Sequence, residues 1–475
     1  MRDIHEAERA VADPGAASAE RLAALAEITK ASGLGSDGLG SDGLGAAGRR
    51  GLARPRSGES NNHIHTCYSF SPYTPAAAAL AARKAGLDVA GSVDHDSYAA
   101  ASEMRAACAL LGLGSVTGFE LRVSLAEAAT TFPETTARLL TERKLNNPDS
   151  TGIIYMTVQG VPSGAHAEVD HFLLPIRSAR LARTQRMADR ANELLSNLSL
   201  PPIDFERDIL AASKYAEGGT VTERHLLAAV SRSILSEVAP GSKLTAWLEE
   251  NLGLALSASQ RRTLSDAGNP YLVYDLLGTL KAGFLDRIFI QPREECVDVR
   301  DVIALAARIG AIPAYAYLGD VAESPTGDKK AEKFEDEILD ELMPVLHDIG
   351  FPAITYMPPR NTKAQLMRLQ GLCARYGFME ISGVDINQPR QSFNCPELRM
   401  PEFRHLDDAT WAMVAHEALS SVDRRLGLFS RDNPHAHLPI AERIAIYAKA
   451  GRELDLSDPH SYEMQAQRLS EEHRP

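Results

Sequence analysis

The sequence lacks a hydrophobic run that could cross a membrane. Nowhere in its 475 residues does an apolar stretch approach the roughly 18 to 20 residues that a spanning helix needs. The opening, MRDIHEAERAVADPG, is charged and has no apolar centre of the kind that signal peptides carry. We therefore expect a cytoplasmic protein with no membrane partner.

Cysteine is scarce, and its spacing shows no pairing. The number of cysteines is five, which is odd, and no two of them form a CxxC pair. We therefore expect neither a disulfide framework nor a zinc site built from thiolates.

Positive charge is in the minority. The 50 basic residues are outnumbered by 63 acidic ones, which gives a formal net charge of −13. A protein that follows long nucleic acid through bulk electrostatics is rich in positive charge, so we expect no duplex nucleic acid partner. A local basic pocket, or a short oligonucleotide or dinucleotide ligand, is compatible with this balance.

Residues 1–58 differ in composition from the rest of the chain. Ala17 to Lys30 has the spacing of a helix, and GLGSDGLGSDGLG at 33–45 then repeats a Gly-Ser-Asp unit. Such a repeat buries too little apolar surface to offset the entropy of ordering it. We expect an N-terminal helix and a flexible linker here.

From residue 59 onward, short apolar segments alternate with amphipathic helical ones. This alternation predicts an α/β protein with a mostly parallel sheet, and about eight such segments over roughly 330 residues predict a closed barrel. Helices are expected at 298–309, 331–349 and 361–376. The expected strands begin at Asn61 and then lie at 87–96, 115–124, 152–161, 287–292, 312–320, 353–360 and 378–387.

One insertion interrupts this pattern. Residues 180–283 read as helical throughout, and so do the last residues of the chain. The expected division is therefore a first barrel part at 59–179, a helical insertion at 180–283, a second barrel part at 284–397 and a C-terminal helical extension at 398–475.

Imidazole and carboxylate groups recur where the expected strands end. Residues i and i+2 of a strand point to the same side, so His63 and His65 can reach one point in space. In a parallel barrel the active site is built at the C-terminal ends of the strands. Nitrogen and oxygen ligands suit Zn, Mn or Fe. The groups in question are His63 and His65, then Asp94-His95-Asp96, Glu120, and Asp385-Ile386-Asn387.

Four motifs resemble the PHP family, named for polymerase and histidinol phosphatase. They are HIHTCYSFSPYTP (63–75), SVDHDS (92–97), GFELR (118–122) and SGVDINQPRQSF (382–393). The resemblance implies a distorted barrel of seven βα units with up to three metal ions at its C-terminal face. It also implies hydrolysis of phosphate mono- or diesters.

The resemblance implies roles for individual residues. His63, His65, His95, Glu120 and Asp385 match the family's metal ligands. The catalytic group is expected to contain Asp94, which would orient His95, together with His95 itself and Asn387. Arg122, Arg360 and Arg390 stand beside strand ends, and guanidinium groups bind phosphate through paired hydrogen bonds, so these three are the expected substrate-binding residues.

The chain also departs from the family pattern. Asn387 closes a motif that usually reads Asp-x-His, while Gln159 and Tyr317 stand near positions that commonly hold histidine. The loop SFSPYTP contains no histidine, and His166 and His171 are the nearest substitutes. We therefore expect one or two divalent ions (Mn, Zn or Fe) rather than three.

Three further polar segments have a structural and a functional interpretation. Asp96 is expected to cap the following helix rather than bind metal. Glu223-Arg224-His225 after Thr222 indicates a capped helix start, with a role in covering substrate as the alternative. The run PTGDKK at 325–330 is either a solvated loop or a source of positive charge for a phosphate.

These observations lead to one main hypothesis and two alternatives. The main hypothesis is a metal-dependent phosphoesterase that hydrolyses a small phosphate mono- or diester through a metal-bound hydroxide. The first alternative is a PHP-like barrel that binds a ligand or metal without hydrolysis. The second is a metal-dependent hydrolase of a C–N bond. No sequence feature specifies the substrate or the oligomeric state.

Overall fold

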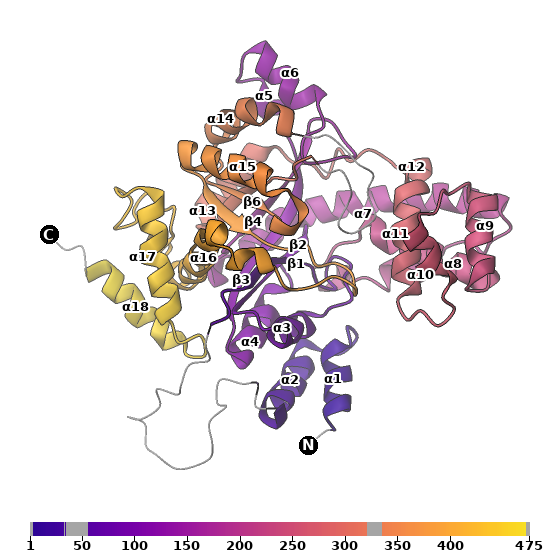
Figure 1. Ribbon diagram of the computed structural model, residues 1–475, viewed down its shortest axis with the longest axis horizontal. Coiled ribbons are helices and arrows are strands. Elements are labelled where there is room, and N and C mark those ends of the chain that lie inside the picture. Colours follow the sequence, from indigo (N-terminus) through magenta and orange to yellow (C-terminus); the bar gives the residue numbers. More distant parts are fainter. Residues whose placement is uncertain (1–2, 33, 35–55, 321–334, 472–475) are drawn as a thin grey trace.

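The computed structural model describes residues 3–32, 34, 56–320 and 335–471 (Figure 1). The linker expected at 33–45 lies outside the described residues except for residue 34, and the run at 325–330 lies outside them altogether. Within the described part of the chain, no helix combines the length and the apolar character needed to span a bilayer.

Seven strands form a single sheet in the described part of the chain, in the same order as in the sequence. β1, β2 and β3 pair in parallel, and so do β5, β6 and β7, whereas β4 is antiparallel to both of its neighbours. The strands are β1 (Ser60–Ile64), β2 (Val89–His95), β3 (Gly114–Ser124), β4 (Ile153–Gln159), β5 (Ile312–Ala316), β6 (Ala353–Tyr356) and β7 (Met379–Ser382).

The sheet curls until its first and last strands meet. The Asn62 side chain donates a hydrogen bond of 3.0 Å to the Ser382 carbonyl of β7. Beyond β7, the Ile386 N–H donates to the His63 carbonyl, and the His65 N–H donates to the Ile386 carbonyl. The result is a nearly closed, distorted α/β barrel of seven strands, so the expected fold class is confirmed.

One strand of the expected sheet is wrong. Residues 287–292 form no strand: helix α12 (Leu285–Ile288) occupies their start, and Ile288 packs among the apolar side chains of the helices at 166–283. The sheet is mostly parallel, as expected, and its exception is β4, which returns against β3 after the short helices α5 (Ala126–Ala129) and α6 (Glu134–Glu142). Apolar spacing indicates that a segment is buried, but it does not specify the core that buries it or the direction of the strand.

Helices on the outside of the barrel follow most strands. The helices expected at 298–309 and 361–376 are confirmed, and the helix expected at 331–349 is shorter within the described residues. Asp298 caps the first of them by accepting a hydrogen bond from the Arg300 N–H. The outer helices are α3 (Pro75–Lys84), α4 (Ala101–Leu111), α13 (Val299–Ile309), α14 (Leu339–Ile349) and α15 (Lys363–Tyr376).

A group of helices stands beside the barrel, on the right of Figure 1. These helices surround an apolar cluster of their own, which includes Leu226, Leu244 and Leu276. We call residues 166–288 the helical insertion; the boundaries expected at 180 and 283 stay a prediction. Besides α12, its helices are α7 (His166–Asn197), α8 (Glu223–Glu237), α9 (Ser242–Leu252), α10 (Ala258–Ser265) and α11 (Leu272–Gly283).

The two ends of the chain add further helices. The helix expected from Ala17 is confirmed as α2 (Ser18–Ser32), which is preceded by α1 (Ile4–Ala12); the buried Arg21 of α2 donates a 2.8 Å hydrogen bond to Glu103 of α4. The helices α16 (Arg404–Val422), α17 (Ile440–Glu453) and α18 (Pro459–Glu471) follow the barrel.

The C-terminal helices close one end of the barrel. Trp411 and Met413 of α16 share an apolar cluster with Val89, Ala353 and Met379, the first residues of β2, β6 and β7. The N-terminal ends of the strands are therefore covered by α16, and the polar residues at the opposite ends face the helical insertion instead.

Candidate metal centre and cavity

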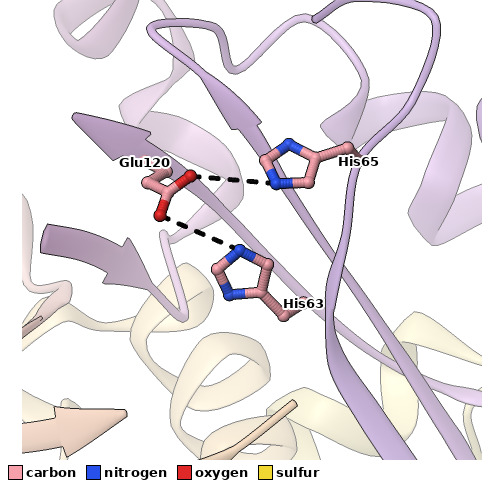
Figure 2. A group of neighbouring side chains, drawn as sticks. All are labelled: His63, His65 and Glu120. Carbon is pink, nitrogen blue, oxygen red and sulfur yellow. Dashed lines mark ion pairs between the residues drawn. The ribbon is translucent and has the colours of Figure 1, made fainter. Parts of the chain in front are cut away.

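Two histidines and a glutamate converge at the C-terminal edge of the barrel. Each of His63, His65 and Glu120 offers a ligand atom, and these atoms lie within 4.8 Å of one another. His63 Nε2 is 3.9 Å from Glu120 Oε1, and His65 Nε2 is 3.8 Å from Glu120 Oε2 (Figure 2). All three residues are buried. The His-x-His spacing at the end of β1 thus turns both imidazoles toward Glu120 of β3.

His95 and Asp385 complete this cluster. His95 Nδ1 lies 2.9 Å from Glu120 Oε2, and His65 Nε2 lies 3.3 Å from Asp385 Oδ1. The rings of His65 and His95 are 4.6 Å apart between centroids. All five side chains expected to bind metal are therefore neighbours, although they come from β1, β2, β3 and the segment after β7.

The protonation states suit a cation. Burial, with a further contribution from His95, lowers the pKa of His65 to about 3, so its imidazole is neutral near pH 7. Burial would raise the pKa of Glu120, but His95 and the other two histidines outweigh it and hold this pKa well below its usual range. Neutral imidazole and ionised carboxylate are the forms that bind Zn, Mn or Fe, so these residues fit a divalent ion.

Asp94 acts on a different histidine from the one expected. Its carboxylate accepts hydrogen bonds from the Thr66 N–H, the Thr66 hydroxyl and the Ser69 hydroxyl, at 2.7, 2.6 and 2.5 Å. The Ser69 oxygen lies 3.3 Å from His65 Nδ1. Because Ser69 gives its only proton to Asp94, it accepts from Nδ1–H of His65, which leaves the Nε2 lone pair facing the cluster. Asp94 therefore orients His65 through Ser69.

The direction of β4 explains one departure from the family pattern. Gln159 pairs with Gly118 in the sheet, and its side chain donates a 2.8 Å hydrogen bond to the Asn62 carbonyl. The β4 residue near the metal edge is instead Tyr155, whose ring lies 6.2 Å from that of His95. A histidine at position 159 of this antiparallel strand would have lain away from the cluster.

The other substitutions have distinct positions. The Asn387 side chain donates a 2.7 Å hydrogen bond to Asp385 Oδ1, so it orients a candidate ligand. The Tyr317 hydroxyl donates to Asp336. His166 packs against Tyr98, with ring centroids 5.3 Å apart. Neither His166 nor His171 is among the described residues that line the cavity beside the cluster.

A cavity of about 590 Å³ adjoins the cluster. Its barrel side carries His63, His95, Glu120 and Asp385, and it is large enough for a small organic phosphate. Its opposite side is formed by the helical insertion. The insertion residues that line it include Arg224, Ser257, Gln260, Thr263, Tyr274 and Lys281.

Of the three arginines expected at substrate, the structure brings two to the cavity. Arg360 and Arg390 line it, and Arg390 also binds the insertion through Asn269 and Asp275, at 2.8 and 3.0 Å. Arg122 is not among the described lining residues. Its guanidinium donates to Glu295 at 2.6 Å and to Glu223 at 3.0 Å, and it is buried. Both carboxylates lie far away in the sequence, so nothing local to Arg122 indicated this pairing.

Asp96 is also not the helix cap that the sequence suggested. Helix α4 begins only at Ala101, and Asp96 accepts a 2.6 Å hydrogen bond from Arg180 of the insertion. Its backbone φ of 50° lies in the left-handed region, where the chain turns sharply after His95. By contrast, the capped helix start expected after Thr222 is confirmed at α8, where the Thr222 N–H donates to His225 Nδ1.

Comparison with known protein families and with curated proteins finds no match for this chain. Among solved structures it is similar to a provisionally assigned metal-dependent phosphoesterase from Bifidobacterium adolescentis, with 20% identity, a TM-score of 0.45 and coverage of 71% of this chain and 93% of that one. It is also similar to an amidohydrolase from Chromobacterium violaceum with bound sulfate and no metal, with 15% identity, a TM-score of 0.45 and coverage of 74% and 96%. In its own motifs and its seven-stranded barrel, the chain resembles the PHP family.

Proposed function

We propose that this chain is a metal-dependent hydrolase and, more specifically, a phosphoesterase acting on a small phosphate mono- or diester. One observation carries the proposal: imidazoles and carboxylates from four separate segments, with His63, His65 and Glu120 buried, meet at the edge of a cavity that also presents arginines. A purely structural role does not require this donor set, because buried ionisable groups are costly unless they are paired or bind a cation.

His63, His65 and Glu120 would hold the first divalent ion, and His95 and Asp385 would complete its ligands or hold a second. When bound, such an ion acts as a Lewis acid that lowers the pKa of water to about 7 and polarises a phosphoryl oxygen. The pairing of imidazole nitrogens with carboxylate oxygens supports Mn, Zn or Fe.

The remaining residues bind and orient. Ser69 and Asp94 hold the ring of His65, and Asn387 holds the carboxylate of Asp385. Arg360 and Arg390 line the cavity, so their guanidinium groups would bind phosphoryl oxygens and stabilise the charge that develops there during attack by water. The P–O bond to the alcohol then breaks, and the alcohol leaves with a proton that the attacking water has given up.

Turnover of a panel of phosphate mono- and diesters in the presence of Mn, Zn, Mg or Fe tests this proposal. Phosphate release above background is expected, and His65→Ala and Asp385→Ala should each abolish it while the circular-dichroism spectrum stays that of the wild type. His347→Ala, on the outer helix α14, is the matched control, because this histidine is exposed and is not among the described residues that line the cavity.

Other outcomes favour the alternatives. Full activity in both site variants would falsify the proposed mechanism. Stoichiometric metal binding without turnover of any ester would favour a barrel that binds a ligand or metal without hydrolysis. Product analysis that finds C–N cleavage without phosphate release would favour the other hydrolase class. The small phosphorylated substrate and the cytoplasmic location stay predictions.

A further inference from the structure

The first residue of helix α8 is held by three arginines. Glu223 accepts hydrogen bonds from Arg122 of β3 at 3.0 Å, from Arg180 of α7 at 2.8 Å and from Arg183 of α7. Burial would raise the pKa of Glu223, but Arg122, Arg180 and Arg183 outweigh it and hold this pKa well below its usual range. The start of α8 is therefore tied to the barrel and to α7 at a single carboxylate.

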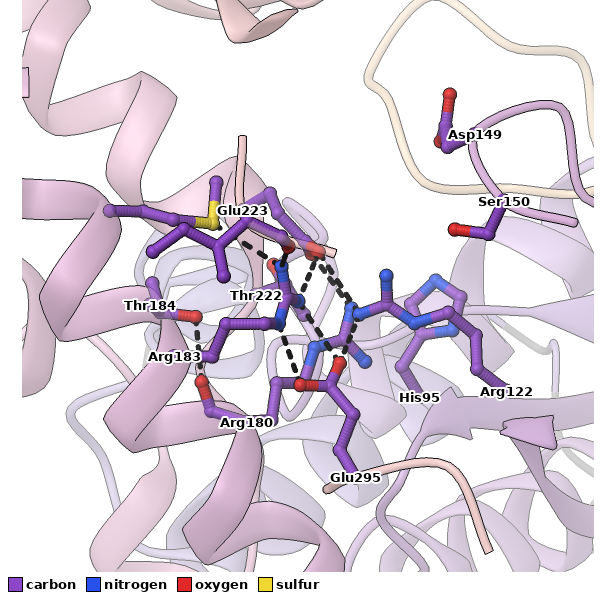
Figure 3. Close-up of polar contacts among 12 residues, drawn as sticks. His95, Arg122, Asp149, Ser150, Arg180, Arg183, Thr184, Thr222, Glu223 and Glu295 are labelled. Carbon is purple, nitrogen blue, oxygen red and sulfur yellow. Dashed lines mark hydrogen bonds and ion pairs between the residues drawn. The ribbon is translucent and has the colours of Figure 1, made fainter. Parts of the chain in front are cut away.

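Two further carboxylates, Asp96 and Glu295, complete this group, which we call the arginine–carboxylate network; Figure 3 shows its three arginines with Glu223 and Glu295. Arg180 donates to Asp96 at 2.6 Å, and Arg122 and Arg183 each donate to Glu295 at 2.6 Å. Three guanidinium groups thus face three carboxylates, and every one of these side chains is at most 14% exposed. Such a network is rigid only while every member is in place.

The residue after Glu223 lines the cavity. Arg224 donates a 3.1 Å hydrogen bond to the Asn387 carbonyl, and its guanidinium lies 5.5 Å from the ring centroid of Phe70. Asn387 in turn binds Asp385, a candidate metal ligand. The insertion therefore places the Arg224 guanidinium beside Asn387, the residue that binds a candidate metal ligand. It does so from the side of the cavity opposite the strand ends.

Helix capping does not explain this placement. Thr222 and His225 already form the reciprocal cap at the start of α8, and an acidic first residue such as Glu223 needs no arginine partners to favour a helix N-terminus. The hydrogen bonds from the three arginines to Glu223 instead fix the direction in which the Arg224 side chain leaves the helix.

We propose that Arg224 is a substrate-binding residue that contacts an oxygen of the phosphate, and that Glu223 is the positioning residue that holds it there. This inference rests on the proposed function of the site. It assigns to Arg224 the contact that the sequence suggested for Arg122, because a planar guanidinium matches the oxygens of a tetrahedral oxyanion. The helical insertion is then part of the active site, and it contributes affinity for the phosphate.

Inorganic phosphate is the probe, and the full chain loaded with Mn is the sample. Mn per chain is measured by elemental mass spectrometry, and phosphate affinity by titration calorimetry. Arg224→Met should keep the wild-type Mn content and bind phosphate about 10- to 100-fold more weakly, the range expected for one lost charge-assisted contact. Arg224→Lys should recover part of the loss. Arg232→Met, on the exposed face of the same helix, should bind phosphate as the wild type does.

The outcomes separate this inference from the function on which it rests. Wild-type affinity for phosphate in Arg224→Met, with Mn retained, would overturn the role of Arg224 and leave the phosphoesterase proposal standing. No Mn, or no phosphate, bound to the wild-type chain would overturn both. If Arg224→Met does not fold, Arg224→Gln gives the same comparison with a polar side chain.

The positioning role has its own test, a double-mutant cycle. Glu223→Gln should weaken phosphate binding because Arg224 loses its anchor, and it should add little loss when Arg224 is already methionine. A merely structural effect would instead weaken binding by the same factor in both backgrounds, and that result would overturn the role of Glu223.

Discussion

A serine is the smallest part of the site with an assignable task. Ser69 stands between the buried Asp94 and His65, donates to the first and accepts from the second. This arrangement selects one imidazole tautomer, so that His65 presents a lone pair and no proton to the cluster.

Replacement of Ser69 by alanine should therefore weaken metal binding without removing any ligand. We expect Mn affinity to fall by roughly 10- to 100-fold, the range for loss of a residue that orients a metal-bound histidine. Calorimetric titration of the metal-free chain with Mn measures this change. Ser71→Ala, in the same loop, is the control, because the Ser71 hydroxyl instead accepts a 3.5 Å hydrogen bond from the Tyr73 N–H. Equal affinity in both variants would rule out the orienting role.

His416 of α16, outside the metal cluster, makes the free energy of unfolding depend on pH. His416 of α16 is buried, and burial lowers its pKa to about 4; its ring contacts the Gly160 carbonyl and accepts from the Leu428 N–H. The unfolded chain takes up a proton near pH 6.5, whereas the folded chain does so only near pH 4. The contribution of His416 is thus full above pH 6.5 and is lost as the pH falls toward 4.

From pH 6.5 to 5 this one group should lower the free energy of unfolding by about 2 kcal/mol. Urea denaturation at the two pH values measures the change. His416→Gln keeps a donor and an acceptor but does not titrate, so its stability should fall less over the same interval. An identical fall in the variant would show that other groups cause the pH dependence.

The sequence predicted the metal cluster better than it predicted the partners of its charged neighbours. Strand geometry permits His63 and His65 to face one point, and the resemblance to the PHP family implies Glu120 and Asp385 as their partners. Arg122 and Asp96 were misread because their partners, Glu295 and Arg180, lie 173 and 84 residues away. Spacing within a segment cannot specify a contact made by two distant segments.

At the scale of elements, one helix joins the barrel to the insertion. Arg180 and Arg183 lie one turn apart on α7, so both guanidinium groups leave the same face of the helix and reach the strand ends. In Figure 1, α7 extends from the barrel toward the other helices of the insertion. The arginine–carboxylate network is therefore an attachment point as well as an anchor for α8.

Arg180→Met should destabilise the chain strongly, because it leaves Asp96 and Glu223 without this buried partner. The expected loss is about 3 to 5 kcal/mol in the free energy of unfolding. Urea denaturation measures it, with Arg186→Met as the control on the exposed side of the same helix. If Arg180→Met lost no more free energy of unfolding than Arg186→Met, the arginine–carboxylate network would contribute little to stability.

The elements themselves were largely predictable, and their arrangement was less so. The strands and outer helices of the barrel follow from apolar periodicity. The antiparallel direction of β4 does not, since the same alternating pattern serves either direction. The failed strand at 287–292 has the same origin: its apolar residues are buried, but by helices of the insertion.

At the scale of the whole molecule, helices close the barrel at the N-terminal ends of its strands, and the candidate metal centre and its cavity lie at the opposite end. Gly451 of α17 lies against the backbone of α16, where an added Cβ would come within 2.1 Å of the Trp411 carbonyl oxygen. Main-chain atoms on both sides leave little room for adjustment, so the two helices can pack this closely only with glycine there.

Gly451→Ala should therefore lower stability by about 1 to 3 kcal/mol through overpacking. Because α16 covers the N-terminal ends of the strands, the metal content of the folded fraction should not change. Thermal unfolding and elemental analysis of one sample measure both quantities. Loss of metal in a fully folded variant would show that the two ends of the barrel are coupled.

The seam between β1 and the segment after β7 has a consequence for how the protein is made. Asn61 donates to the Val384 carbonyl across 323 residues of chain, and His65 binds the backbone of Ile386. During synthesis the first histidines leave the ribosome long before their partner segment exists. The candidate metal centre therefore cannot be complete until residue 386 of 475 has emerged, so capture of the proposed ion by the full ligand set would be a late event in the maturation of the chain.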